Sequence, residues 1–164
     1  MTAPGALPPE PAEAPELLLV EDDAGDIELA VHALRRAALD LRVTVARDGP
    51  SALALLDGRG REDGAPPPRL VLLDLKLPGM HGLSVLEAAK RDPRTRPIPI
   101  VVLSAGLDPV EIARAYELGA NACIEKPADF ATLAELLGRT AAFWLGANRT
   151  VGYRPGSAGQ TLGA

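Results

Sequence analysis

Four short runs of apolar residues recur along this sequence, and polar side chains follow each of them. The most informative run, Leu70–Leu73, leads into Asp74, and Pro78-Gly79 then turns the chain away. A short, continuous apolar run bounded by turn residues is typical of a strand buried on both faces, usually in a parallel sheet. The other runs are 17–20, followed by Glu21-Asp22-Asp23; 100–103, followed by Ser104; and 122–124, followed through Glu125 by Lys126-Pro127.

Segments with the apolar spacing of helices separate these runs. We expect strands at 17–20, 42–47, 70–73, 98–103 and 121–124, and helices at about 26–38, 49–57, 82–91, 109–119 and 129–144. Strands that alternate with helices in this way specify a parallel sheet covered on both faces. With the right-handed crossover rule, the pattern predicts an α/β fold: a three-layer, doubly wound, five-stranded parallel sheet in the flavodoxin-like order 2-1-3-4-5.

In that strand order the first and third strands are neighbours, and their carboxyl ends lie at one edge of the sheet. Glu21, Asp22 and Asp74 should therefore converge there, with Ser104 and Lys126 on adjoining strands. Taken singly, Asp74 and Ser104 are readily explained as strand-end caps, and Lys126 as a solvated surface cation. Their coincidence with an acidic site is much harder to explain by chance.

The chemistry of this set points to phosphoryl transfer. Crowded carboxylates repel one another unless a cation neutralises them, and hard oxygen ligands of this kind suit Mg²⁺. An Asp carboxylate beside Mg²⁺ is able to attack a phosphoryl group and form an aspartyl phosphate. The metal, Lys126 and the Ser104 hydroxyl would then neutralise the charge on the phosphoryl oxygens.

Composition narrows the classes of partner and location. The net charge of −5, without a basic cluster, argues against a nucleic-acid surface or an anionic-membrane patch. Cys123 is the single cysteine, which excludes an intramolecular disulfide and suits a reducing compartment. The sequence has no apolar run of membrane-spanning length and no secretory signal, so we expect a cytoplasmic location. Aromatic residues make up only 3%, so the core must be built from Leu, Val, Ile and Ala.

The chain is expected to form one domain with two extensions. Residues 1–15 contain five prolines and are expected to be a disordered lead-in, 16–145 the folded domain, and 146–164 a C-terminal arm and flexible tail. Phe143, Trp144 and Tyr153 are three of five aromatic residues, yet they lie at or beyond the end of the last helix. Because Trp and Tyr often anchor interfaces, they predict a homodimer. The alternative is that the last helix folds its own aromatic residues back onto the sheet.

Together these residues resemble the response-regulator receiver domain of two-component signalling, over roughly residues 16–144. The matching features are the acidic pair Glu21-Asp22, Asp74 in Leu-Asp-Leu-Lys-Leu-Pro-Gly-Met-His-Gly, the Ser104 hydroxyl, and Lys126-Pro127. The resemblance implies that Asp74 accepts a phosphoryl group from a sensor histidine kinase. It also implies a signalling protein rather than an enzyme, whose only chemistry is its own phosphorylation and dephosphorylation.

The resemblance also assigns a metal site and a backbone feature. It implies that Asp22, Asp74 and the main-chain carbonyl of Lys76 bind Mg²⁺, with Glu21 assisting through water. It further implies that the peptide bond before Pro127 is cis, which would aim the neighbouring lysine. Cys123 is a departure, because the family usually has Tyr or Phe there as a switch that reports phosphorylation.

Several features resemble one subgroup, the stand-alone regulators that often serve bacterial phytochromes. They are Glu-Asp-Asp-Ala-Gly-Asp at 21–26, the long loop before the third strand, the run 116–121, and Phe143-Trp144-Leu145. The subgroup implies a bacteriophytochrome kinase, a downstream protein of unknown identity, and a two-fold dimer through the fourth and fifth helices. Two alternatives remain: a pseudo-receiver that only binds proteins, and a haloacid-dehalogenase-like phosphatase. The phosphatase needs a second acid where this chain has Lys76.

Overall fold

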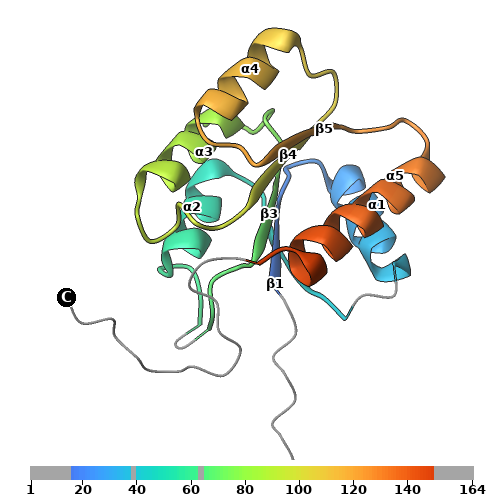
Figure 1. The fold of residues 1–164 in the computed structure, drawn as a ribbon, viewed down its shortest axis with the longest axis horizontal. Helices are drawn as coiled ribbons and strands as arrows, with labels where there is room; N and C mark the ends of the chain where they lie inside the picture. Colours follow the sequence, from blue (N-terminus) through green and yellow to red (C-terminus); the bar gives the residue numbers. More distant parts are fainter. Residues whose placement is uncertain (1–15, 38–39, 63–64, 150–164) are drawn as a thin grey trace, which may run out of the picture.

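The computed structural model describes residues 16–37, 40–62 and 65–149 (Figure 1). The expected lead-in at 1–15 and most of the expected C-terminal extension, including Tyr153, lie outside these residues. The described chain forms one five-stranded parallel sheet in the order β2-β1-β3-β4-β5, which confirms the predicted topology. The strands are β1 (Glu16–Val20), β2 (Arg42–Ala46), β3 (Leu70–Leu73), β4 (Ile100–Ser104) and β5 (Ala122–Glu125).

Helices cover both faces of the sheet (Figure 1). They are α1 (Ala24–Arg36), α2 (Gly49–Asp57), α3 (Gly82–Arg91), α4 (Pro109–Glu117) and α5 (Phe130–Ala141), and α5 continues into the π-helix η1 (Ala142–Ala147). Strand side chains alternate between the faces. In β1, Leu17 and Leu19 pack with α1 and α5, whereas Leu18 and Val20 pack with α2 and α3. The buried hydrophobic residues of the described chain are all Leu, Val, Ile or Ala, as composition predicts.

Side-chain caps fix where the helices begin. Asp23, Asp48 and Asp129 each accept a hydrogen bond from a main-chain amide in the first turn of the following helix. Asp108 and Glu111 form a reciprocal capping box at the start of α4, as the sequence predicts. These caps satisfy amides that have no partner within the helix. Every helix in the described part of the chain is too short or too polar to span a bilayer.

The last helix differs from its prediction. A continuous helix was expected to Trp144, but α5 ends at Ala141 and the chain widens into η1. The widened turn is anchored at Leu145, whose side chain is buried and whose carbonyl oxygen accepts a 3.0 Å hydrogen bond from Arg69. The apolar spacing of the helix does not predict the widened turn, because the hydrogen bond that holds it comes from Arg69, which precedes β3 and is far away in sequence.

Gly82 lets the loop after β3 pack against the end of that strand. A Cβ atom at this position would lie 2.4 Å from the carbonyl oxygen of Asp74 and 2.6 Å from the Cα of Leu75. The Gly82 amide also donates a 2.8 Å hydrogen bond to the Leu75 carbonyl. Glycine is therefore required for the close approach that holds the start of α3 against the end of β3.

Candidate functional site

Glu21 and Asp74 are brought together because they directly follow neighbouring strands. The Asp74 amide donates to the Val20 carbonyl at 3.0 Å, and the Glu21 amide donates to the Ala46 carbonyl at 3.0 Å, so sheet pairing extends to both residues. Their side chains are 3% and 9% exposed, respectively. Two carboxylates are thus held nearly out of water at the carboxyl edge of the sheet, where the strand pattern places them.

Both oxygens of the Asp74 carboxylate have partners. Oδ1 accepts hydrogen bonds from the Ser104 hydroxyl at 2.8 Å and from the Lys76 amide at 3.0 Å. Oδ2 accepts one from Lys126 Nζ at 3.1 Å. The structure therefore brings the serine and the lysine singled out from the sequence to the same carboxylate, from β4 and from the end of β5.

Lys126 contacts three carboxylates. Its Nζ donates to Glu21, to Asp26 at 3.0 Å and to Asp74 at 3.1 Å. The lysine side chain is only 14% exposed, so its ion pairs with the nearly buried Glu21 and Asp74 are shielded from solvent more than surface pairs are, whereas Asp26 is 46% exposed. The ammonium is the central cation of the acidic cluster.

The third carboxylate of this cluster is not one that the sequence singled out. Oxygen atoms of Glu21, Asp26 and Asp74 all lie within 4.8 Å of one another, which is close enough to hold a metal ion. Asp22, expected to be a metal ligand, is exposed and is outside this group. Asp26 was missed because it lies on a helix rather than at a strand end. The available signal was the spacing of Asp23 and Asp26, which predicts a cap and an acid in the first helical turn.

Burial and hydrogen bonding separate the pKa values of the two buried acids. Burial is the main cause that raises the pKa of Glu21 to about 7, and the neighbouring Asp74 adds to it, although Lys126 opposes the shift. Burial also acts to raise the pKa of Asp74, but hydrogen bonds from the Lys76 amide, Glu21 and Ser104 outweigh it and lower that pKa. Asp74 is therefore the member of the pair that stays ionised at neutral pH.

Lys126 remains a cation in this setting. Burial acts to lower its pKa, but the hydrogen bonds to Glu21 and Asp26 and the charge of Asp74 outweigh burial, so the pKa is raised. A cation that keeps its proton and touches the ionised Asp74 is suited to neutralise additional negative charge at that carboxylate.

The prediction of a cis peptide bond before Pro127 is wrong. The described residues contain no cis peptide bond. With the trans bond, Lys126 still reaches Asp74, because ion pairs with Glu21 and Asp26 direct its long side chain toward the acidic edge.

Lys76 contributes its main chain to the site and its side chain to a neighbouring loop. Its amide binds Asp74, whereas its ammonium donates a 3.0 Å hydrogen bond to the carbonyl of Ala105, which follows β4. The position two residues after Asp74 thus holds a cation tied to the β4–α4 loop. This arrangement does not supply the second acid that a haloacid-dehalogenase-like phosphatase needs.

Cys123 lies on β5 where the family's aromatic switch is usual. Its side chain is partly buried and packs against the core on the α2/α3 side, and burial raises the pKa of its thiol. Tyr116 of α4 is half exposed, and its hydroxyl oxygen accepts a 3.2 Å hydrogen bond from the Cys123 amide. An aromatic ring therefore reaches this strand from the adjacent helix.

The two described aromatic residues near the C-terminus have different surroundings. Phe143 is 53% exposed, whereas Trp144 packs in part against the core between the sheet, α1 and α5. Their rings meet edge to face with centroids 5.1 Å apart. Trp144 therefore follows the alternative in which the helix keeps its own aromatic residue, and Phe143 remains on the surface.

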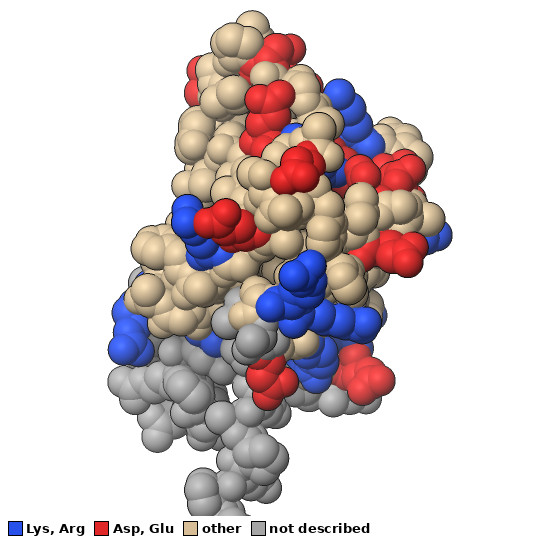
Figure 2. Space-filling model, turned by 90° about the vertical axis from the view of Figure 1, so that its right-hand side faces the viewer, with Lys and Arg blue, Asp and Glu red and all other residues tan. Residues whose placement is uncertain are grey.

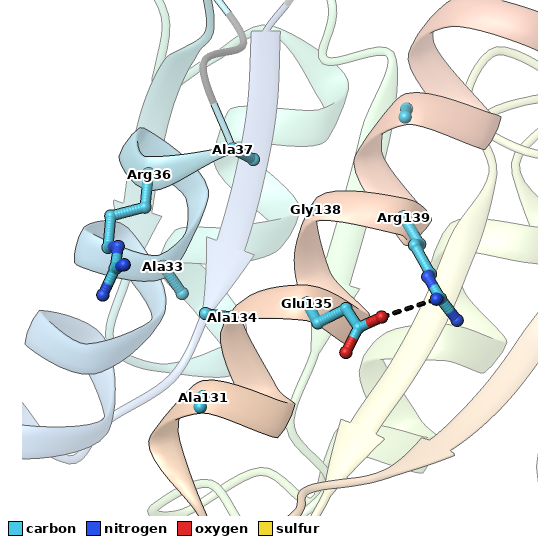
Figure 3. Close-up of a pocket in the computed structure, with 9 residues that line it drawn as sticks. Ala33, Arg36, Ala37, Ala131, Ala134, Glu135, Gly138 and Arg139 are labelled. Carbon is cyan, nitrogen blue, oxygen red and sulfur yellow. Dashed lines mark hydrogen bonds and ion pairs between the residues drawn. The ribbon is translucent and has the colours of Figure 1, made fainter.

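A groove between α1 and α5 is separate from the acidic cluster. It has a volume of about 450 Å³ and is lined mainly by small residues, including Ala33 of α1, Ala37 directly after that helix, and Ala134 of α5 (Figure 3). Glu135 and Arg139 form an ion pair at its rim.

Charged side chains of both signs lie on this side of the molecule. Acidic side chains predominate in the upper half of the view and several basic ones gather below, so neither charge covers the face (Figure 2).

Comparison with known proteins identifies relatives of this architecture. A family model described as the response regulator receiver domain matches residues 17–138. The chain is 34% identical to response regulator Rcp1 of Synechocystis over 129 residues, which cover 79% of this chain and 88% of Rcp1. It is also 38% identical to the probable methanogenesis regulatory protein FilR2 of Methanothrix harundinacea, over 83% of this chain and 87% of FilR2.

Solved structures show the same relationship. The phosphorylated cyanobacterial phytochrome response regulator RcpA has a TM-score of 0.78 and 36% identity, over 84% of this chain and 99% of RcpA. The Mn²⁺-bound form of Rcp1 has a TM-score of 0.75 and 32% identity, over 83% of this chain and 98% of that structure. Relatives of this fold therefore include one structure described as phosphorylated and one described as metal-bound.

Proposed function

This chain belongs to the response-regulator receiver-domain family, and on that premise we propose that it accepts a phosphoryl group on Asp74 and signals by phosphorylation-dependent protein binding. The observation that carries the proposal is the setting of Asp74. Its carboxylate is buried, has a lowered pKa, and contacts a hydroxyl on one oxygen and an ammonium on the other. This is the environment of an ionised nucleophile prepared for an incoming anion.

The proposed transfer requires few groups. A carboxylate oxygen of Asp74 attacks the phosphorus of the donor, and a new P–O bond forms as the bond to the donor breaks. With a phosphohistidine donor, the electron pair of the P–N bond returns to the imidazole nitrogen. Because Ser104 and Lys126 contact different oxygens of Asp74, both lie beside the transferred group whichever oxygen attacks. They would then bind the phosphoryl oxygens.

A divalent cation fits the charge of the site. Three carboxylates lie within 4.8 Å of one another, and Lys126 offsets only one negative charge. We propose Mg²⁺ as the cofactor, held by Glu21, Asp22, Asp74 and the Lys76 carbonyl, with Asp22 reaching it from the exposed side. When bound, the ion would neutralise the phosphoryl oxygens. The metal-bound form of Rcp1 supports this assignment by similarity.

The direct test is labelling of the full chain with acetyl phosphate. We expect the intact mass to increase by one phosphoryl group in the presence of Mg²⁺ and to remain unchanged when EDTA removes the ion. The reason is that the carboxylates repel an anionic donor until a cation offsets them. Heat-denatured protein serves as the control, and labelling that is independent of metal would contradict the proposed site.

Similarity to phytochrome response regulators supports a choice of partner. We propose that a sensor histidine kinase, of the bacteriophytochrome type, supplies the phosphoryl group, and that a separate downstream protein reads the phosphorylated state. RcpA is described as a phytochrome response regulator, and Rcp1 is similar to this chain over nearly all of its own length. The direct observation that would support this partner is transfer from such a kinase to this chain.

We further propose that the chain forms a homodimer, with Phe143 at the contact. This side chain is half exposed on η1, directly beyond α5, and large exposed aromatic residues favour interfaces. A two-fold contact would bury Phe143 of both copies at once. Trp144 contributes less in this arrangement, because it already packs within its own chain.

A surface substitution tests the dimer without disturbing the core. Phe143→Ser should shift the protein from dimer to monomer in sizing with light scattering, because the contact loses its apolar anchor. Leu29→Ser is the matched control, since Leu29 is a 44% exposed apolar residue on α1. A chain ending at Arg149 tests whether Tyr153 contributes. A wild-type protein that stays monomeric at high concentration, with or without beryllofluoride, would refute the proposal.

A further inference from the structure

Lys126 has no spare donor in the unphosphorylated protein. A lysine ammonium carries three N–H groups. In this structure Nζ donates to Glu21, Asp26 and Asp74, so each N–H group can serve one carboxylate. A phosphoryl group on Asp74 would add further acceptor oxygens next to this ammonium. The donor that now faces Asp74 can turn to these oxygens, because phosphorylation removes the negative charge of that carboxylate. A second donor becomes available only if Lys126 gives up Glu21 or Asp26.

The two remaining partners differ in how easily they can be given up. The Glu21 side chain is nearly buried, whereas that of Asp26 is 46% exposed. A buried carboxylate that loses its cation is left without compensation, which costs far more than loss of a surface ion pair. Water can hydrate the Asp26 carboxylate as soon as Lys126 leaves it. Asp26 is therefore the partner that can be released at least cost.

The position of Asp26 is well defined even though its side chain reaches solvent. The main-chain amide of Asp26 donates a 2.8 Å hydrogen bond to the capping carboxylate of Asp23. This bond fixes Asp26 in the first turn of α1, beside the carboxyl edge of the sheet. The negative charge of Asp26 is thereby kept at the acidic cluster, with a carboxylate oxygen within 4.8 Å of oxygens of Glu21 and Asp74.

We propose that Asp26 is a positioning residue that competes with the phosphoryl group for Lys126. In the unphosphorylated protein it holds one donor of the ammonium, and it releases that donor to the phosphoryl oxygens when Asp74 is modified. The inference rests on the proposed phosphorylation of Asp74 and goes further, because it assigns a role to an acid outside the strand-end set. Asp26 also adds one negative charge that attracts a divalent cation to the same cluster.

These two roles predict opposite effects of one substitution. Asp26→Asn removes a negative charge near the metal site, so Mg²⁺ should bind roughly five- to tenfold more weakly. The same change weakens the hold on Lys126 and reduces repulsion of an incoming anion. At saturating Mg²⁺, beryllofluoride, which mimics the phosphoryl group, should therefore bind more tightly by a similar factor. A merely structural role would weaken both ligands together.

The experiment compares the wild-type chain with Asp26→Asn, Asp26→Glu and Glu28→Gln. Calorimetry measures Mg²⁺ binding, and fluorine NMR measures beryllofluoride binding at saturating Mg²⁺. Asp26→Glu keeps the charge and should restore both affinities toward those of the wild type. Glu28→Gln removes the same charge from an exposed position on the same helix. It should change neither affinity by more than about twofold, because exposed charges beyond contact distance are screened.

The outcomes separate this inference from the proposed function. Weaker Mg²⁺ binding together with tighter beryllofluoride binding in Asp26→Asn alone supports the competition. If Asp26→Asn weakens both ligands, changes neither, or behaves like Glu28→Gln, the competition is refuted while phosphorylation of Asp74 stands. If the wild-type chain binds no beryllofluoride with Mg²⁺ present, the proposed function itself is contradicted.

Discussion

Asp74→Asn should give a folded protein that gains no phosphoryl group from acetyl phosphate, with or without Mg²⁺. Asparagine has nearly the shape of aspartate, so its side-chain oxygen can keep the hydrogen bonds from Ser104 and the Lys76 amide. It lacks the charged oxygen that attacks phosphorus, so we expect complete loss of labelling rather than a slower rate. Intact mass spectrometry after a fixed incubation measures the result.

The matched control for this change is Asp92→Asn. Asp92 follows α3 and pairs with the exposed Arg94, so the substitution removes an equal charge away from the site. It should be labelled like the wild type. Labelling of Asp74→Asn at the wild-type level would show that another side chain accepts the phosphoryl group, and the proposed role of Asp74 would be wrong.

Lys126→Ala should bind Mg²⁺ and beryllofluoride but fail to reach the activated conformation. Without the ammonium, the phosphoryl charge on Asp74 has no cation from the protein to draw β5 toward it. The substitution also leaves Glu21 and Asp74 without their shared counter-ion. Because the pair is buried, the free energy of unfolding should fall by about 3 kcal/mol without metal, and Mg²⁺ should restore part of it.

Amide NMR spectra recorded with and without beryllofluoride check this prediction. In the wild type, signals from the end of β4 to β5 should move on addition of the ligand, and in Lys126→Ala those shifts should be largely lost. Arg91→Ala removes an exposed cation that pairs with Glu87, and it should behave like the wild type. Unchanged shifts in Lys126→Ala would remove this lysine from the activation mechanism.

Ser104→Ala should act in the same direction with a smaller effect. The hydroxyl is an uncharged donor to Asp74, whereas Lys126 contributes a full positive charge. An uncharged donor stabilises the added negative charge of a phosphoryl group less than a cation does, so part of the spectral change should survive. A Ser104→Ala spectrum with a complete wild-type response would show that the hydroxyl is dispensable.

The sequence predicted the sheet order because burial and alternation both leave a clear pattern. Apolar runs such as Leu70–Leu73 are buried throughout, and their order along the chain permits few topologies. The convergence of Glu21 and Asp74 follows directly, since residues at the ends of adjacent parallel strands must lie close together. Strand ends are therefore positions where a linear pattern fixes three-dimensional proximity.

Helix-borne and long-range features were harder to predict. Asp26 joins the cluster because of the direction in which α1 leaves β1, which no local spacing specifies. Asp22 stands beside Glu21 in sequence but is exposed, since neighbouring residues after a strand point in different directions. The widened turn η1 depends on Arg69, a contact between residues that are far apart in the chain.

The hydrogen bond between Tyr116 and the Cys123 amide also bears on how the protein behaves at high concentration. β5 is an outer strand of the sheet, and an outer strand with free amides is a template on which another chain can add a strand. The Tyr116 hydroxyl occupies one of these amides from within the same molecule. The ring that reaches the position of the usual switch thus also helps to keep this edge of the sheet from aggregating.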